Sequence, residues 1–121
     1  MSEYEDQGFK LSKFVYIIID EQIYPLDKTI ISIGRKLDND LVINNNFVSR
    51  RHAEIRYESE EFFIYDLGST SGTFVNNQRI EKSILYSGDH ITLANVPLVF
   101  IYEGGPPEAD LDDTTGKIGS R

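Results

Sequence analysis

The sequence predicts an all-β fold, a β-sandwich of two twisted, mainly antiparallel sheets. Turn signals recur about every 8 to 12 residues and separate short runs rich in β-branched and aromatic residues. No window of about eleven or more residues carries the apolar stripe of an amphipathic helix. With 121 residues, 40% of them hydrophobic, the chain is large enough for one ordinary core.

Three segments are expected along the chain. Residues 1–12 form a polar, flexible lead, and residues 13–102 carry all the strand signals. Residues 103–121 begin with a Gly-Gly-Pro-Pro stretch and continue with acidic residues and few apolar ones. This composition favours a disordered tail or a linker after the folded domain.

The expected strands are short and follow one another closely. The run KFVYIIID opens the domain, and Pro25 assigns the next run to a sheet edge or a bulge. Residues 53–58 alternate between apolar and charged side chains, the pattern of a half-buried strand. Residues 62–67 are apolar on both faces, which favours an interior position. The full set of expected strands is 13–20, 23–26, 29–33, 41–43, 53–58, 62–67, 73–75, 79–80, 84–86, 90–94 and 98–102.

The expected connections are polar and turn-prone. Asparagine residues 44–46 and the small residues 68–72 mark two loops, since asparagine and glycine tolerate left-handed backbone conformations. Tight turns are expected at Glu21-Gln22 and at Asn76-Asn77. Residues 95–97 are expected to join the last two strands.

The charge and the absence of cysteine restrict the classes of function. The formal net charge is −8, and an acidic chain repels DNA and RNA, so nucleic acid is not an expected partner. No cysteine is present for a disulfide or a thiolate metal site. The longest apolar run is far shorter than the roughly 20 residues of a membrane span, and the start does not resemble a signal peptide. We therefore expect a cytoplasmic protein that does not bind membranes.

Catalysis is not expected. Ser49, His52 and Asp66 could be imagined as a triad, but no sequence feature marks a nucleophile elbow. The two histidines are not grouped with acids at a metal-ligand spacing, and no glycine-rich loop opens a helix to bind a nucleotide. We expect no enzyme activity, no metal and no cofactor, and we interpret His52 as a residue that braces a loop.

Basic and hydroxyl residues gather in three loops despite the acidic composition. A local positive focus is formed by Arg35, Lys36, Arg50 and Arg51. Residues 68–73 read Gly-Ser-Thr-Ser-Gly-Thr, which supplies hydroxyls and exposed backbone N–H groups. Taken alone, these features are typical of surface arginines and a plain turn. If a sandwich brings the three loops to one end, we expect their basic and hydroxyl residues to form a composite pocket for an anion such as phosphate.

Four motifs in order resemble the forkhead-associated (FHA) domain. They are Gly34-Arg35, Ser49-Arg50-Arg51-His52, DLGSTSGTFVN over residues 66–76, and GDHITL over residues 88–93. The resemblance covers roughly residues 13–102. It implies a β-sandwich of about eleven strands that binds phosphothreonine peptides through the loops at one end.

The resemblance also implies roles for particular residues. Arg35 reaches the phosphate or the peptide backbone, and the Ser49 hydroxyl holds phosphate oxygens. Arg50 occupies a variable position that often touches the phosphate. Thr70 lies near the phosphate and the pocket for the threonine methyl group.

Further positions match the family's supporting residues. Asn76 matches an asparagine that supports the binding loops, and Gly34, His52 and Gly72 match positions that are mainly architectural. Ser71 stands where the family commonly has an asparagine that fixes the peptide backbone. Serine has one hydroxyl in place of an amide, so one peptide contact is expected to be lost or bridged by water.

We therefore predict a phosphothreonine-dependent protein-interaction module in Ser/Thr kinase signalling. The expected partner is a phosphothreonine-containing protein, such as a kinase or its substrate. The alternative is a scaffolding or assembly domain of the same fold with no phosphate dependence, which the departure at Ser71 favours.

The acidic tail suggests a self-binding alternative. Thr114 and Thr115 follow two aspartates, and Ile118 lies three residues after Thr115, a position that the family often reads. If phosphorylated, either threonine could dock in its own pocket or that of a neighbouring copy. A plain linker is the favoured interpretation of this segment.

Overall fold

The computed structural model describes residues 15–103. The expected lead at residues 1–12 lies outside the described residues. So does the expected tail after Glu103, with Thr114 and Thr115. Residues 15–103 contain no helix, and therefore none that is long and apolar enough to cross a membrane.

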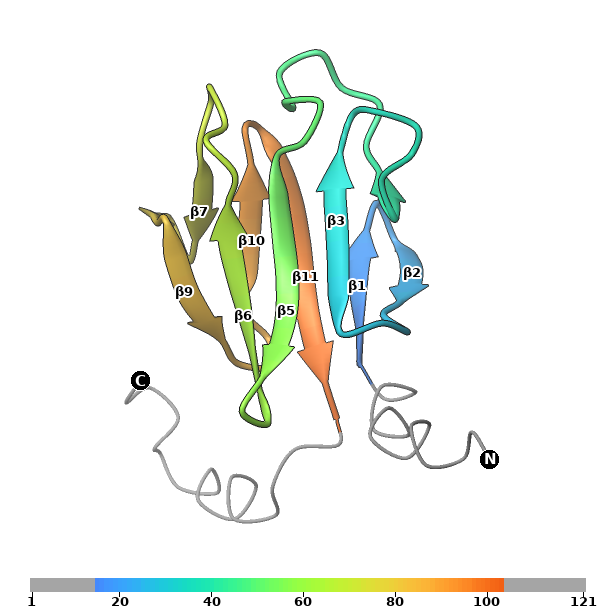
Figure 1. Ribbon diagram of the computed structural model, residues 1–121, viewed down its shortest axis with the longest axis vertical. Coiled ribbons are helices and arrows are strands. Elements are labelled where there is room, and N and C mark those ends of the chain that lie inside the picture. The colour runs from blue at the N-terminus through green and yellow to red at the C-terminus, as the bar shows by residue number, and fades with distance from the viewer. Residues whose placement is uncertain (1–14, 104–121) are drawn as a thin grey trace.

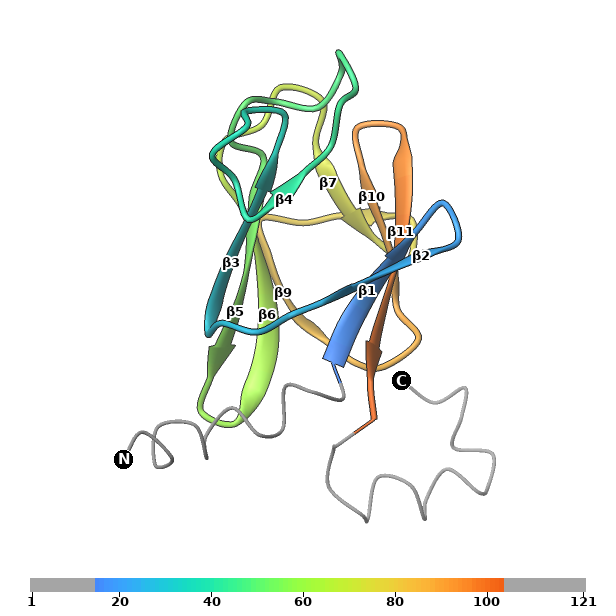
Figure 2. The same cartoon turned by 90° about the vertical axis from the view of Figure 1, so that its right-hand side faces the viewer.

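Eleven strands form two sheets that pack face to face (Figure 2). The six-stranded sheet has the order β2-β1-β11-β10-β7-β8, and the five-stranded sheet has the order β4-β3-β5-β6-β9. Every strand pairing is antiparallel except that of β3 with β4. The predicted sandwich is confirmed. Its strands are β1 (Val15–Ile19), β2 (Gln22–Pro25), β3 (Ile30–Gly34), β4 (Leu41–Val42), β5 (Ala53–Glu58), β6 (Glu61–Asp66), β7 (Thr73–Val75), β8 (Gln78–Arg79), β9 (Lys82–Leu85), β10 (His90–Leu93) and β11 (Val96–Tyr102).

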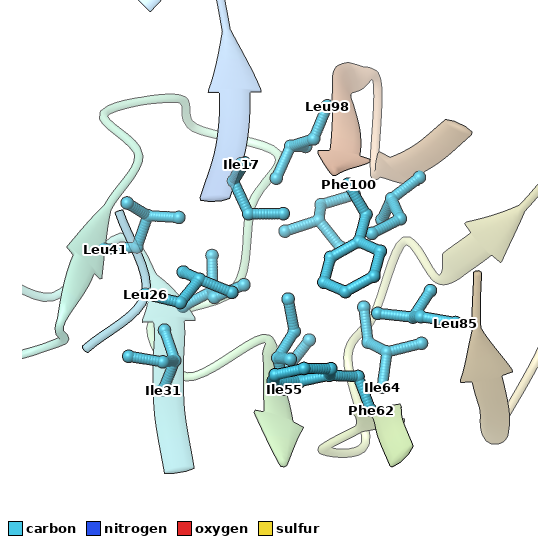
Figure 3. Packing of buried hydrophobic residues seen from close by; sticks show 14 of the residues in the cluster. Ile17, Leu26, Ile31, Leu41, Ile55, Phe62, Ile64, Leu85, Leu98 and Phe100 are labelled. Atoms are coloured by element: carbon cyan, nitrogen blue, oxygen red, sulfur yellow. The ribbon is translucent and has the colours of Figure 1, made fainter. Parts of the chain in front are cut away.

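The core lies between the two sheets and is aliphatic with a few aromatic rings (Figure 3). Ile17 and Phe100 enter it from the six-stranded sheet, and Ile64 enters it from the five-stranded sheet, all three fully buried. The rings of Phe62 and Phe100 meet across the layers with centroids 5.4 Å apart. Alternate residues at the buried positions of β1, β5, β6 and β10 face this layer, as a period of two requires.

Two positional predictions from the sequence hold. β2, with Pro25, is an edge strand, and β6 lies in the interior of its sheet between β5 and β9. Proline lacks the N–H that an interior strand must donate. β6 has a neighbouring strand at each edge, and its outward-facing rings, Phe63 and Tyr65, are only partly buried.

The hairpin turns correct the predicted strand ends. The first turn is Asp20-Glu21, one residue earlier than expected, with φ of 55° and 67°. A two-residue turn with both φ values positive matches the right-handed twist of the flanking strands, and aspartate is a usual residue in such a turn whereas glutamate is not. Residues Val96 and Pro97 belong to β11, not to a connecting loop. Pro97 lies beyond Val99, the last residue of β11 that pairs with β1, so its missing N–H costs that ladder nothing.

The β3–β4, β4–β5 and β6–β7 loops lie at the same end of the sandwich, the upper end in Figures 1 and 2. β3 and β6 both end there, and β5 begins there. The β10–β11 turn lies at the same end. The prediction that the basic and hydroxyl loops meet is confirmed.

Candidate anion-binding site

A hollow of about 440 Å³ opens between these loops. Four of its lining residues are those predicted to bind phosphate. The other two are cations that the sequence analysis assigned to the local positive focus but to no specific role. The lining residues are Arg35, Lys36, Ser49, Arg50, Arg51 and Thr70.

Backbone hydrogen bonds fix the β3–β4 loop against the β4–β5 loop. The backbone N–H of Arg35 donates to the carbonyl of Ser49 at 3.0 Å, and that of Lys36 donates to the carbonyl of Arg50 at 3.2 Å. The Nε–H of Arg35 donates to the carbonyl of Val48 at 3.0 Å. This bond fixes one edge of the guanidinium of Arg35, a residue that lines the hollow.

Gly34 permits the close approach of the two loops. A Cβ atom at this position would lie 2.2 Å from the carbonyl oxygen of Arg50, a distance that no side chain can occupy. Asn39, only 7% exposed, completes the junction. Its Nδ2 donates to the carbonyls of Lys36 at 2.9 Å and Arg50 at 2.8 Å.

His52 joins the β4–β5 loop to the β6–β7 loop and is fully buried. Its Nδ1 accepts the backbone N–H of Ser49 at 3.0 Å, so the ring proton is on Nε2. That nitrogen donates to the carbonyl of Gly72 at 2.8 Å. Both ring nitrogens are therefore bonded to backbone groups. The ring pairs with the main chain of Ser49 and not with its hydroxyl, so these contacts do not build a catalytic triad.

Asp66 organises the hydroxyl-rich β6–β7 loop. Its Oδ1 accepts the hydroxyls of Ser69 at 2.6 Å and Thr73 at 2.7 Å. Its Oδ2 accepts the backbone N–H groups of Gly68 at 3.0 Å and Ser69 at 3.1 Å. Burial alone would raise the pKa of Asp66, but these hydrogen bonds outweigh it and the pKa lies below its ordinary value.

The sequence places Asp66 in an imagined triad and at the start of the 66–76 motif, and neither pattern indicates this structural role. The signal was present in the sequence, because Asp66 precedes Gly68-Ser69 by two residues, the spacing of an Asx turn in which an aspartate accepts backbone N–H groups two residues on.

Ser49 and Thr70, which lie on different loops, are in direct contact. The backbone N–H of Thr70 donates to the Ser49 Oγ at 3.2 Å. Because that oxygen acts as an acceptor in this bond, the Ser49 O–H remains available to donate to an anion. Thr70 is exposed on the rim of the hollow.

The four cations of the hollow differ in how far they are neutralised. Arg51 pairs with Asp38 at 2.9 Å, and the Nζ of Lys36 lies 3.8 Å from the same carboxylate. Within residues 15–103, the Arg50 guanidinium makes no hydrogen bond or ion pair, and that of Arg35 makes only the bond to Val48. Arg35 and Arg50 therefore offer most of their donors to a ligand.

Ser71 and Asn76 lie apart from this hollow. Ser71 lines a second, smaller hollow of about 210 Å³ with Phe47, Ala94 and Asn95. Asn76 lies at the other end of β7 and lines neither hollow.

Asn76 supports the β7–β8 turn, where its φ is 51°. Its Nδ2 donates to the Asp89 carboxylate at 3.0 Å, and its Oδ1 accepts the backbone N–H of His90 at 2.9 Å. These contacts hold the turn against the start of β10.

Within residues 15–103, no group of three or more histidine or acidic residues could hold a metal ion.

A β-sandwich with a basic, hydroxyl-lined hollow between its end loops is an architecture for binding an anion on another macromolecule. The family model of the FHA domain matches residues 31–94, which include every residue that lines the hollow. The chain belongs to the FHA domain family.

Two curated relatives are similar to this chain over about half of their own length. The glycogen accumulation regulator GarA of Mycobacterium tuberculosis is 41% identical over 75% of this chain and 55% of its own length. The oxoglutarate dehydrogenase inhibitor of Corynebacterium glutamicum is 37% identical over 69% of this chain and 57% of its own length. The matched part of the chain thus spans about half the length of these relatives.

Solved structures with the same fold include proteins studied with phosphorylated ligands. Mycobacterium tuberculosis EmbR in complex with a low-affinity phosphopeptide is 34% identical, with a TM-score of 0.72 over 76% of this chain and 25% of that one. An FHA domain whose interactions depend on phosphothreonine is 33% identical, with a TM-score of 0.70 over 74% of this chain and 96% of that one.

Proposed function

We propose that this domain binds partner proteins through a phosphothreonine in Ser/Thr kinase signalling. The observation that carries the proposal is the convergence of Arg35, Arg50, Ser49 and Thr70 on one hollow. A phosphothreonine has a charge of about −1.5 to −2 at neutral pH and three strong acceptor oxygens. Two guanidinium groups and a hydroxyl donor complement this charge and this number of acceptors.

The two arginines contribute in different ways. The bond to Val48 orients the Arg35 guanidinium, so we assign Arg35 the role of a preoriented donor to the phosphate or to the peptide backbone. The Arg50 guanidinium has no partner in the described part of the chain and is free to close on the phosphate. Each charge-assisted hydrogen bond contributes about 1.5–3 kcal/mol, so these contacts dominate the affinity.

The remaining residues are assigned to the peptide and to support. Thr70, on the rim, lies near the phosphate and the threonine methyl group, and Ser71 faces the peptide backbone. His52 and Gly72 hold the loops through their mutual hydrogen bond, with Gly34 allowing the close approach. We place Asn76 in a supporting position, since it does not line the hollow.

We further propose that the domain is non-catalytic, needs no cofactor and acts in the cytoplasm on a kinase or on a kinase substrate. Relatives named as a regulator and as an inhibitor support an interaction module. Both ring nitrogens of His52 are bonded to backbone groups, which leaves neither of them free to act as a base.

A phosphate-independent scaffolding domain is the second candidate. The serine at position 71, where the family resemblance leads one to expect asparagine, favours it because a peptide-backbone contact is weakened. Binding of a native partner that survives both phosphatase treatment and Arg35→Ala would support this candidate over the first.

An oriented peptide library with a fixed phosphothreonine tests the proposed function and defines the ligand at once. We expect enrichment of particular residues around the phosphothreonine and none around a matched unphosphorylated threonine. The same enrichment in both libraries, or none in either, would contradict the proposal.

A further inference from the structure

We infer that the hollow contains a second anion subsite, formed by Lys36 and Arg51, which selects partners with another anionic side chain close to the phosphothreonine. That side chain is a carboxylate or a second phosphate. The inference rests on the proposed function and deepens it, since it concerns which phosphothreonine proteins this site takes.

The charge of the hollow exceeds what one phosphate needs. Its lining provides four cations. Arg35 and Arg50 already match the charge of about −1.5 to −2 on a single phosphothreonine. Lys36 and Arg51 add two more positive charges, and Asp38 is the carboxylate that they share. One positive charge is therefore left over, in a chain whose formal net charge is −8.

The size of the hollow is consistent with more than one ligand group. Its volume is about 440 Å³. A phosphate group has five heavy atoms and fills the space of a few water molecules, each with a share of about 30 Å³ in the liquid. The hollow therefore has room beside the phosphate for a neighbouring side chain of the partner.

Lys36 and Arg51 are held in place through their backbone and their neighbour Asn39. The Nδ2 of Asn39 binds the carbonyl of Lys36, and its Oδ1 accepts the Nη1–H of Arg51 at 3.2 Å. Asn39 is buried, whereas the side chains of Lys36 and Arg51 are 53% and 47% exposed. Because the backbone around Lys36 and Arg51 is already fixed and their charged ends are exposed, binding an anion there costs little conformational entropy.

Asp38 pairs with this subsite at the surface, more closely with Arg51 than with Lys36. Its side chain is 56% exposed, its Oδ2 accepts the Nη2–H of Arg51 at 2.9 Å, and the Nζ of Lys36 lies 3.8 Å away, near the limit of an ion pair. Exposed ion pairs contribute little to stability, with a median of about 0–1 kcal/mol. An incoming anion can therefore bind Lys36 and Arg51 beside Asp38 or displace it.

The test compares matched phosphothreonine peptides, taken from one that the domain binds, by isothermal titration calorimetry. Glutamate is placed in turn at each of the three positions on either side of the phosphothreonine, with glutamine at the same position as the neutral partner. A third series places phosphoserine there, which distinguishes a carboxylate from a second phosphate as the preferred group. We expect at least one position where the anionic peptide binds about three- to tenfold more tightly than the glutamine peptide, within the range of one or two exposed ion pairs.

The variant Lys36→Gln identifies the source of the preference. We expect it to reduce the ratio of glutamate to glutamine affinities toward one. Lys36→Gln is chosen before Arg51→Gln because Arg51 also bonds to Asn39 and its loss could loosen the loop. The matched control is Lys82→Gln, which makes the same charge change on β9, outside the hollow, and should keep the ratio.

Two results would overturn the inference while leaving the proposed function intact. One is a parent phosphopeptide that binds with no anionic position giving an advantage. The other is an advantage that persists unchanged in Lys36→Gln and in Arg51→Gln. A parent peptide that binds equally with and without its phosphate would instead contradict the proposed function, and the second subsite with it.

Discussion

The Nε2 of His52 lies 2.8 Å from the carbonyl oxygen of Gly72, while its Nδ1 accepts the backbone N–H of Ser49. One buried ring thus holds together the two loops that provide the hydroxyl side of the hollow. The geometry of the site depends on this side chain, although it does not line the hollow itself.

We expect His52→Ala to lower the free energy of unfolding by about 2–4 kcal/mol, because it leaves a cavity and two unpaired backbone groups. Urea denaturation monitored by far-UV circular dichroism measures this loss, because the sequence has no tryptophan for a fluorescence signal. His90→Ala is the matched control, since His90 is exposed on β10, and it should change stability by less than about 0.5 kcal/mol. Equal losses in the two variants would show that the ring does not hold the loops.

Gly34→Ala tests the close approach of the β3–β4 and β4–β5 loops. The new Cβ would lie 2.2 Å from the carbonyl oxygen of Arg50, so the loops must separate, at about 1–3 kcal/mol of stability. Hydrogen exchange should show a less protected Lys36 N–H, which bonds to that same carbonyl. In the control Gly68→Ala the new Cβ meets no atom within 4 Å, so only the strain of a φ of 74° applies. Undiminished protection of the Lys36 N–H in Gly34→Ala would be inconsistent with the observed packing.

Ser71→Asn should strengthen phosphopeptide binding. An amide at this position restores a carbonyl and an NH₂ group toward the peptide backbone. A neutral hydrogen bond is worth about 0.5–1.5 kcal/mol, which corresponds to a gain of up to roughly tenfold in affinity. The control is Ser59→Asn in the β5–β6 turn, at the end of the sandwich away from the hollow (Figure 1). Titration calorimetry that gives Ser71→Asn the same affinity as the unaltered domain, or a weaker one, would rule out this role for position 71.

Asp66 makes the domain sensitive to acid. The folded-state pKa of Asp66 lies below its ordinary value, because its hydrogen bonds with Ser69, Thr73 and Gly68 outweigh the effect of burial. A depressed pKa means that the carboxylate stabilises the fold above the unfolded-state value of about 3.9, and that this contribution is lost as the pH falls through the folded value.

Urea denaturation between about pH 6 and pH 2 measures this contribution. We expect Asp66→Asn to be less stable than the unaltered domain at neutral pH and to lose less stability on acidification. Asp40, whose pKa is lowered by its hydrogen bonds with Lys28 and Ser32, adds a slope of the same sign that Asp40→Asn removes separately. A pH dependence in Asp66→Asn as steep as in the unaltered domain would contradict the role of Asp66.

Most of the fold is predictable from the sequence because strand periodicity and turn residues act locally. The alternation at residues 53–58 and Pro25 in an edge strand are such cases. The turn lies at Asp20-Glu21, one residue before the predicted pair. Glutamate is not typical at a left-handed position, so strand twist and pairing decide the geometry at Glu21. Val96 and Pro97 were assigned to a loop for a similar reason, since the pairing of β10 with β11 overrides the local signal of proline.

The residues that line the site were predictable from the sequence, whereas the hydrogen bonds and ion pairs between its loops were not. Arg35, Ser49, Arg50 and Thr70 were marked by residue type, and the structure gathers them in one hollow. Periodicity does not reveal which groups bond across loops, so the role of Asp66 and the sharing of Asp38 by two cations emerged only from the three-dimensional arrangement.

The central claim is that the hollow reads the phosphate of a phosphothreonine, and titration of one matched peptide pair tests it most directly. The phosphorylated peptide should bind, and the unphosphorylated one should be at least about a hundredfold weaker, as expected for the loss of two or more charge-assisted hydrogen bonds. Arg50→Ala should lose about ten- to a hundredfold in affinity without loss of stability, since the Arg50 guanidinium has no hydrogen bond or ion pair within residues 15–103 and the backbone bonds of Arg50 are kept. Equal affinity for the two peptides would contradict the account.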